Sequence, residues 1–247
     1  MRTLILVGAA ALSLSAIAPA LAADMPLKAA PVAAPVAPWQ GFFFGGSLGG
    51  DWEDPGLWTF GDGRTVQLPS ASSWVAGLHT GFNWQFGHLV LGTETNYRFT
   101  DLSSSSACPG TAGQNRLGGL ICQQRIQNIF TFGGRAGFAY SDWLLYGTGG
   151  YASTAMETNT FNATTGLFND GAGHWHNGWF GGAGLEYLLT PDIVLGVQYT
   201  HINVNNHTET VAPVNLVEDR NISAKIDMVE ARVSFKLWSG MWGPFSK

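Results

Sequence analysis

Three observations predict the fold of this chain: apolar and polar residues alternate with a period of two, no apolar run beyond the N-terminus is long enough for a spanning helix, and short and long connections alternate strictly. They indicate an all-β fold, an eight-stranded antiparallel up-and-down transmembrane β-barrel with short periplasmic turns and long extracellular loops. Composition agrees, because charged residues make up only 12% of the 247, about half the share in soluble domains, whereas 33 are glycine and 10 are tryptophan.

The N-terminus is typical of an export signal. A basic start at Arg2 precedes an apolar core over residues 4–18 and a small-x-small motif that ends at Ala22. We expect a signal peptide over residues 1–22, and a retained membrane anchor is the alternative. Because Arg2 is the one charged side chain removed, 11 of the 12 basic residues remain against 17 acidic ones, a net charge of −6. This balance excludes nucleic acid as a partner, since such binding needs clustered basic charge.

A segment rich in proline and alanine follows the predicted signal peptide. Residues 23–38 lack periodicity and are expected to form an extended periplasmic linker. The folded part begins near Trp39. We therefore divide the rest of the chain into an outer-membrane β-barrel over residues 39–238 and a C-terminal extension over residues 239–247.

The strands are assigned in order from their alternation. The first, at about residues 40–52, and the fifth, at about residues 143–158, are too rich in glycine for their faces to be assigned. In each of the other strands, the last of which ends at Leu237, apolar residues occupy every second position and so share one face. The clearest of these apolar residues are Trp74, Leu78, Phe82, Trp84, Leu89, Leu91, Tyr97, Phe99, Phe130, Phe132, Phe138, Tyr140, Trp179, Leu185, Tyr187, Val229, Val233 and Phe235.

The connections set the topology. Three tight breaks alternate with four long polar segments, which are expected to be periplasmic turns and external loops respectively. The breaks lie at residues 86–88, 141–142 and 190–192, and the long segments at about residues 53–72, 101–123, 159–172 and 205–221. Strands of about ten to fifteen residues between them are long enough to cross an outer membrane at a tilt.

Polar residues of the opposite parity are expected to face the lumen. The interior of an eight-stranded barrel is only just wide enough for side chains to fill it. It is too narrow to hold the apolar faces of all strands, because these faces include tryptophan and phenylalanine. In the fourth strand this polar parity includes Arg125 and Thr131. The predicted polar network of the lumen consists of Glu94, Arg98, Arg135, Glu186, Glu230 and Arg232. Three acidic groups can then neutralise three basic ones, with Glu186 pairing to an arginine, because an unpaired buried charge is costly. A soluble barrel or sandwich with solvated charges is the alternative.

Three stretches of the chain resemble a known family. They are WQGFFFGG over residues 39–46, FTFGGRAGFAYSDWLLYGTGGYA over residues 130–152, and GWFGGAGLEYLLTPDIVLGVQYTHI over residues 178–202. All three resemble small porin-like and opacity-type outer-membrane proteins of Gram-negative bacteria, over residues 39–237. The resemblance implies an eight-stranded barrel with a role as porin, surface antigen or haemin binder. The chain departs from the family by continuing past Leu237, where the family usually ends on an aromatic residue.

Both cysteines fall in the predicted loop between strands three and four. An exported protein meets an oxidising compartment, so Cys108 and Cys122 are expected to form a disulfide. Free thiols are the alternative. Two cysteines without a nearby pair of histidines do not make a zinc site.

Three histidines suggest a ligand site at the extracellular rim. Counting back from the turn at residues 190–192 places His207 opposite His174 and His176. Imidazole ligates haem iron and transition metals, and neighbouring tryptophans can pack a porphyrin. The alternative is that these histidines contact only water or lipopolysaccharide phosphate.

No catalytic group stands out. His201 faces outward, but its same-face neighbour two positions on is Asn203 rather than a nucleophile. His79 and Glu94 can form an acid/base pair only in a lumen without room for substrate. We therefore expect no enzymatic activity and no cofactor.

These observations predict a non-enzymatic integral protein of the cell outer membrane that contributes to envelope structure and presents extracellular loops. Haemin or metal binding is one alternative function, and a small-solute pore is another, although a filled lumen passes solutes poorly. Expected partners are outer-membrane lipid, lipopolysaccharide, the barrel assembly machinery and an extracellular ligand of the loops.

Overall fold

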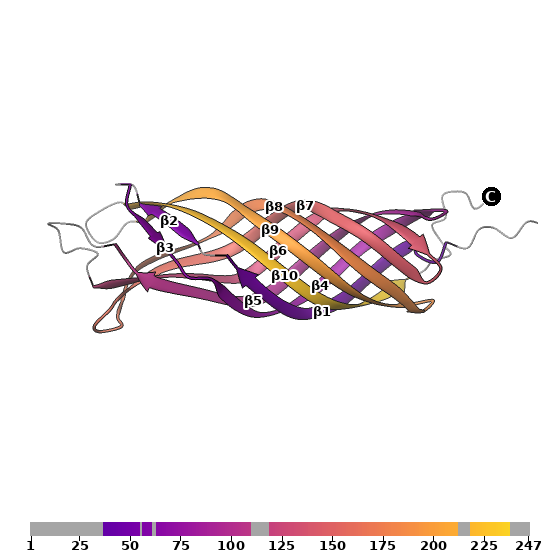
Figure 1. Cartoon of the computed structure of the whole chain (residues 1–247), viewed down its shortest axis with the longest axis horizontal. Helices are drawn as coiled ribbons and strands as arrows, with labels where there is room; N and C mark the ends of the chain where they lie inside the picture. Colours follow the sequence, from indigo (N-terminus) through magenta and orange to yellow (C-terminus); the bar gives the residue numbers. More distant parts are fainter. Residues whose placement is uncertain (1–36, 55, 61–62, 110–118, 212–217, 238–247) are drawn as a thin grey trace, which may run out of the picture. The chain divides into compact units, whose positions relative to one another are not determined.

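A computed structural model shows that the chain folds into a closed barrel of long antiparallel strands (Figure 1). It describes residues 37–54, 56–60, 63–109, 119–211 and 218–237, within a compact unit that begins at Ala37. The predicted signal peptide, most of the predicted linker and the C-terminal extension lie outside the described residues. The strands are β1 Gly41–Glu53, β2 Leu57–Phe60, β3 Thr65–Gln67, β4 Ala71–Phe86, β5 Leu89–Ala107, β6 Leu120–Tyr140, β7 Trp143–Asn162, β8 Phe168–Thr190, β9 Ile193–Val211 and β10 Glu218–Leu237.

Eight of these strands form the ring. Neighbours along the order β1-β4-β5-β6-β7-β8-β9-β10 pair antiparallel, and β10 closes on β1. Closure removes open sheet edges, which a bilayer does not tolerate. The predicted eight-stranded antiparallel barrel is therefore confirmed.

The register of the ring fixes the tilt of the strands. Following paired residues round the barrel from Gly41 leads back to Asp51, ten positions further along β1. A stagger of ten residues over eight strands gives a tilt of about 40° at ordinary strand spacings. This tilt lies in the range of outer-membrane barrels.

Large apolar side chains cover the outside of the barrel between two aromatic levels. On β4, Trp74 is 56% exposed and Trp84 is 41% exposed. Ten residues at this tilt cover about 25 Å, the height of the apolar band of an outer-membrane barrel. We treat the segments between these levels as membrane-spanning. Other aromatic residues at the two levels are Trp52, Phe99 and Trp179 toward the long loops, and Trp143 and Tyr187 toward the short turns.

The strands continue well beyond the apolar band. The eight strands of the ring range from 13 residues in β1 to 23 in β8, so much of the predicted loops at 101–123 and 159–172 is strand. The predicted loop at 53–72 contains a hairpin, β2 and β3, that pairs with β10 beyond the end of β1. These extensions form because their inward residues are apolar and build a core of their own, which includes Leu102, Ile126 and Met156.

A bulge on β6 shifts the alternation of that strand above the apolar band, whereas β5 keeps its alternation throughout. Register breaks lie between Phe99 and Leu102 on β5 and around residue 127 on β6. The placement of Arg125 on the lumen face was therefore wrong. Its side chain is exposed and donates from Nε to Oδ1 of Asp101 at 2.7 Å. A bulge adds one residue and turns the following side chains to the other face.

Candidate functional site

A network of buried ion pairs fills the lumen at the level of the apolar band. Its centre is Glu94 on β5, whose two oxygens accept bonds from two arginines. Arg135 on β6 donates to one oxygen at 3.1 Å, and Arg232 on β10 donates to the other at 2.9 Å. Arg135 also donates to Glu186 on β8 at 2.8 Å. Four strands are thereby joined across the lumen.

A second group lies nearer the long loops. Arg98 on β5 donates from Nε to Oε2 of Glu230 on β10 at 2.8 Å, and from Nη1 to Oγ1 of Thr131 at 3.1 Å. Ser47 on β1 donates to the other oxygen of Glu230 at 2.6 Å. The structure thus places all six predicted lumen residues inside the barrel, each with a partner of opposite charge.

The charges in this network balance. Three glutamates face three arginines, and all six side chains are at most 5% exposed. Removing such charges from water is costly, and only close pairing with further hydrogen bonds offsets that cost. The network therefore fits a lumen that is filled and fixed rather than one lined by free charges.

Tyr146 on β7 belongs to the network but was not predicted, because β7 is rich in glycine. Its hydroxyl donates to Gln198 at 2.9 Å and accepts a bond from Arg232 at 3.2 Å. The guanidinium of Arg135 lies 3.9 Å from the centre of its ring. Gly184 on β8 is required here, since a Cβ at that position would clash with the Tyr146 ring. Glycine thus makes room for a large side chain inside the barrel.

An apolar core closes the lumen above the ion pairs. The hairpin of β2 and β3 inserts Trp58, which is 0% exposed, and its indole donates to Gln124 on β6 at 2.8 Å. Gln124 in turn donates to Glu53 at 2.5 Å. Glu53 lies one residue beyond the upper aromatic level, and burial raises its pKa to about 8, although the bond from Gln124 opposes that rise. The lumen therefore holds ion pairs within the apolar band and, beyond it, a mainly apolar core that also contains Glu53 and Gln124.

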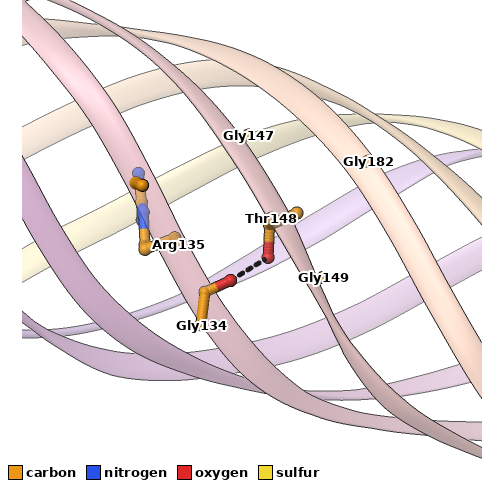
Figure 2. A pocket seen from close by; sticks show the side chains of 7 residues that line it. Gly134, Arg135, Gly147, Thr148, Gly149 and Gly182 are labelled. Carbon is orange, nitrogen blue, oxygen red and sulfur yellow. Dashed lines mark hydrogen bonds between the residues drawn. The ribbon is translucent and has the colours of Figure 1, made fainter.

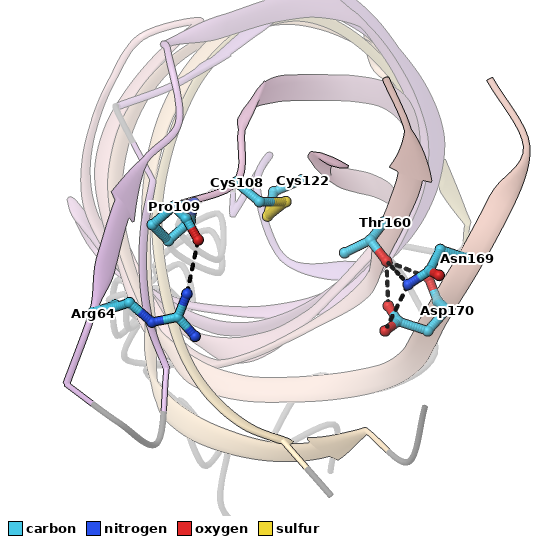
Figure 3. Close-up of a disulfide and its surroundings, with 7 residues drawn as sticks. All are labelled: Arg64, Cys108, Pro109, Cys122, Thr160, Asn169 and Asp170. Atoms are coloured by element: carbon cyan, nitrogen blue, oxygen red, sulfur yellow. Dashed lines mark hydrogen bonds between the residues drawn. A yellow bond between two sulfur atoms is a disulfide. The ribbon is translucent and has the colours of Figure 1, made fainter. Parts of the chain in front are cut away.

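A disulfide ties the long-loop end together. Cys108 follows β5 and bonds to Cys122 on β6, as Figure 3 shows, which confirms the predicted pair. Nearby, Arg64 after the β2–β3 turn donates to the carbonyl of Pro109 at 2.7 Å. Closing a chain segment of this length is worth about 3 kcal/mol in the loop-entropy model.

Two of the three rim histidines are described, and they occupy different environments. His176 faces the interior and is 1% exposed, whereas His174, two residues earlier on β8, is exposed. The side chain of His207 lies outside the described residues. Within the part of the chain that the structure describes, no group of three or more histidine, cysteine or acidic residues is arranged to hold a metal ion. The haemin or metal cluster therefore stays a prediction.

A shallow hollow lies on the apolar outer surface of β6 and β7. Gly134, Gly147 and Gly149 present no side chains there and leave about 440 Å³ of open space (Figure 2). Thr148 donates to the carbonyl of Gly134 at 3.0 Å and holds the two strands together. Because the hollow is floored by backbone and lies within the apolar band, it offers no catalytic group.

Comparison with known proteins identifies the family. The family described as "Outer membrane protein beta-barrel domain" matches residues 8–227. The chain belongs to this family. It is accordingly a β-barrel protein of the outer membrane. Among the residues that the structure places, no helix is long and apolar enough to cross a membrane.

Three relatives of this outer membrane β-barrel are named as outer-membrane proteins, and two of them as immunogenic ones. The 31 kDa outer-membrane immunogenic protein of Brucella melitensis is 28% identical over 95% of each chain. The 25 kDa outer-membrane immunogenic protein of Brucella ovis is 30% identical over 85% of this chain and 93% of its own. The 22 kDa outer membrane protein of Rhizobium leguminosarum is 29% identical over 68% of this chain and 67% of its own.

Solved structures of two other outer-membrane proteins are also similar to this chain. The outer membrane protease OmpT of Escherichia coli has a TM-score of 0.48 at 11% identity, covering 79% of this chain and 96% of its own. OprG of Pseudomonas aeruginosa has a TM-score of 0.46 at 13% identity, covering 80% and 98%.

Proposed function

We propose that this outer membrane β-barrel is a closed, non-enzymatic protein that contributes to envelope structure and presents its long-loop end to the outside of the cell. Its partners are outer-membrane lipid and lipopolysaccharide at the aromatic levels, the barrel assembly machinery during insertion, and an extracellular ligand at the loops. A small-solute pore is the function that this proposal rejects.

The proposal rests on the lumen being blocked at two levels. Ion pairs centred on Glu94 bridge opposite strands within the membrane, and the apolar core around Trp58 fills the barrel above them. An ion that crosses must displace the paired charges and then enter an apolar region, where an unpaired charge is strongly disfavoured. Two different barriers in series therefore oppose conduction.

The outer surface supports the non-enzymatic part of the proposal. His201 on β9 bonds through Nδ1 to Asp227 on β10 at 2.7 Å, and Tyr199 donates to the same carboxylate oxygen at 2.5 Å. A hydrolase with a covalent mechanism would need a serine, threonine or cysteine beside this histidine. The positions paired with His201 are Gly181 and Asp227, which supply none.

Planar-bilayer recording tests the closed lumen. The refolded protein, shown to be folded by heat-modifiable migration in gels, is expected to give no steady current, while an open porin reconstituted in the same way reports conduction. Large and stable channels from the folded protein would refute the proposal. The membrane assignment itself predicts that folding requires detergent or lipid, so a soluble, monodisperse, strand-rich product without either would contradict it.

A further inference from the structure

A small pocket lies inside the short-turn end of the barrel, below the ion pairs. Trp39, Asn83, Glu186 and Lys236 contribute side chains to its wall. About 10 Å³ of the pocket can be reached by the centre of a water molecule, which is room for one water. The pocket is therefore too small for an organic ligand.

Three polar atoms around this pocket are buried and make no hydrogen bond to any residue that the structure describes. They are Nε1 of Trp39, Oδ1 of Asn83 and Oε1 of Glu186. Each residue is almost fully buried, at 1% exposure for Trp39 and 4% for the other two. Buried polar groups in native proteins are nearly always satisfied by protein or by ordered water. Three such atoms around one pocket indicate a shared partner.

The chemistry of the wall selects that partner. An indole N–H can only donate, whereas the carboxylate of Glu186 and the amide oxygen of Asn83 accept. A cation is disfavoured by the indole hydrogen and by the ammonium of Lys236, and an anion is disfavoured by Glu186. Water accepts one bond and donates two, and buried waters typically make about three hydrogen bonds.

We propose that this pocket binds a single structural water molecule, which accepts from Trp39 and donates to Asn83 and Glu186. The water links the start of the barrel to the ion-pair network, because the other oxygen of Glu186 accepts from Arg135 at 2.8 Å. The backbone N–H of Trp39 is already held by Gln85 at 2.8 Å. Trp39 is thereby fixed across the short-turn end. This inference holds whether or not the lumen conducts, so it is independent of the proposed function.

Nuclear magnetic resonance of the full mature protein in detergent micelles tests the site. The Trp39→Phe variant identifies the Trp39 indole signal by its loss. We expect Overhauser cross-peaks from that hydrogen to the water resonance, with opposite signs in the laboratory and rotating frames, the mark of a long-lived bound water. Trp58 is the matched control, because its buried indole already donates to Gln124 at 2.8 Å and should show no such peak. Absence of the peak at Trp39, or equal signs caused by exchange, would overturn the proposal.

Two variants locate the partners of the water, each with its fold checked by heat-modifiable migration. Asn83→Leu keeps similar volume and removes an acceptor, so the cross-peak should fall several-fold, and an unchanged peak would overturn the assignment. Lys236→Met removes exchanging ammonium hydrogens from the wall. The peak should survive this change, and its loss in a folded variant would show that the signal was relayed through Lys236 rather than arising from bound water.

Discussion

Replacing Arg135 is expected to destabilise the barrel strongly, because its guanidinium serves two buried carboxylates. It donates to Glu94 at 3.1 Å and to Glu186 at 2.8 Å. In Arg135→Met, Glu94 keeps its bond from Arg232, but Glu186 keeps no arginine. Leaving one buried charge uncompensated costs about 3 to 5 kcal/mol. Since about 1.4 kcal/mol is a factor of ten, the unfolding equilibrium should shift by roughly two to three and a half powers of ten.

Urea unfolding in lipid vesicles, followed by tryptophan fluorescence and by heat-modifiable migration, measures this cost. Arg125→Ala is the control, because its pair with Asp101 is exposed and should contribute nothing measurable. The double variant Arg135→Met, Glu186→Gln should recover part of the lost stability, since it removes both members of the pair. Wild-type stability of Arg135→Met, or an equal loss in Arg125→Ala, would refute the reasoning.

Three further predictions concern the long-loop end. Cys108→Ser should lower the unfolding free energy by about 3 kcal/mol, and reducing agent should have the same effect on the wild type but none on the variant. Burial raises the pKa of Glu53 from 4.5 to about 8, so the folded state binds its proton more tightly than the unfolded state. Stability from this group is fully present below about pH 4.5 and falls as pH rises toward 8. Glu53→Gln should flatten that part of the pH profile, and an unchanged slope would contradict the assignment. Haemin should bind intact cells weakly or not at all, because His176 is buried. A saturable spectral shift that is lost when His174, His176 and His207 become Ala would contradict this prediction and support the haemin-binding alternative.

Strand parity predicted the lumen residues because the side-chain period of a strand is two, and it assigned Glu94 and Arg135 without knowledge of the barrel's stagger. It could not say which carboxylate meets which arginine. That depends on the ten-residue shift of the closed register, a property of all eight strands together. Arg98 accordingly pairs with Glu230, although the two are 132 residues apart.

Three parts of the site escaped prediction for physical reasons. Ser47 and Tyr146 lie on strands so rich in glycine that no alternation remains to assign their faces. Arg125 lies on the long-loop side of a bulge in β6, which local composition does not reveal, so its face was misassigned. Trp58 lies in a short polar segment, and only pairing with β10 makes a strand of it. Local pattern thus sufficed for regular strands and failed where tertiary pairing decided the conformation.

The strand extensions beyond the aromatic level have a consequence for immune recognition. Their outward polar residues, such as Ser103 and Gln123 on adjacent strands, are held at fixed spacing by a hydrogen-bonded sheet over an apolar core. An antibody raised against this surface would read a discontinuous epitope, assembled from strands distant in the chain. Such an epitope would vanish on heat denaturation, whereas one on a linear peptide would persist. Antibodies meant to recognise this surface should therefore be raised against folded protein.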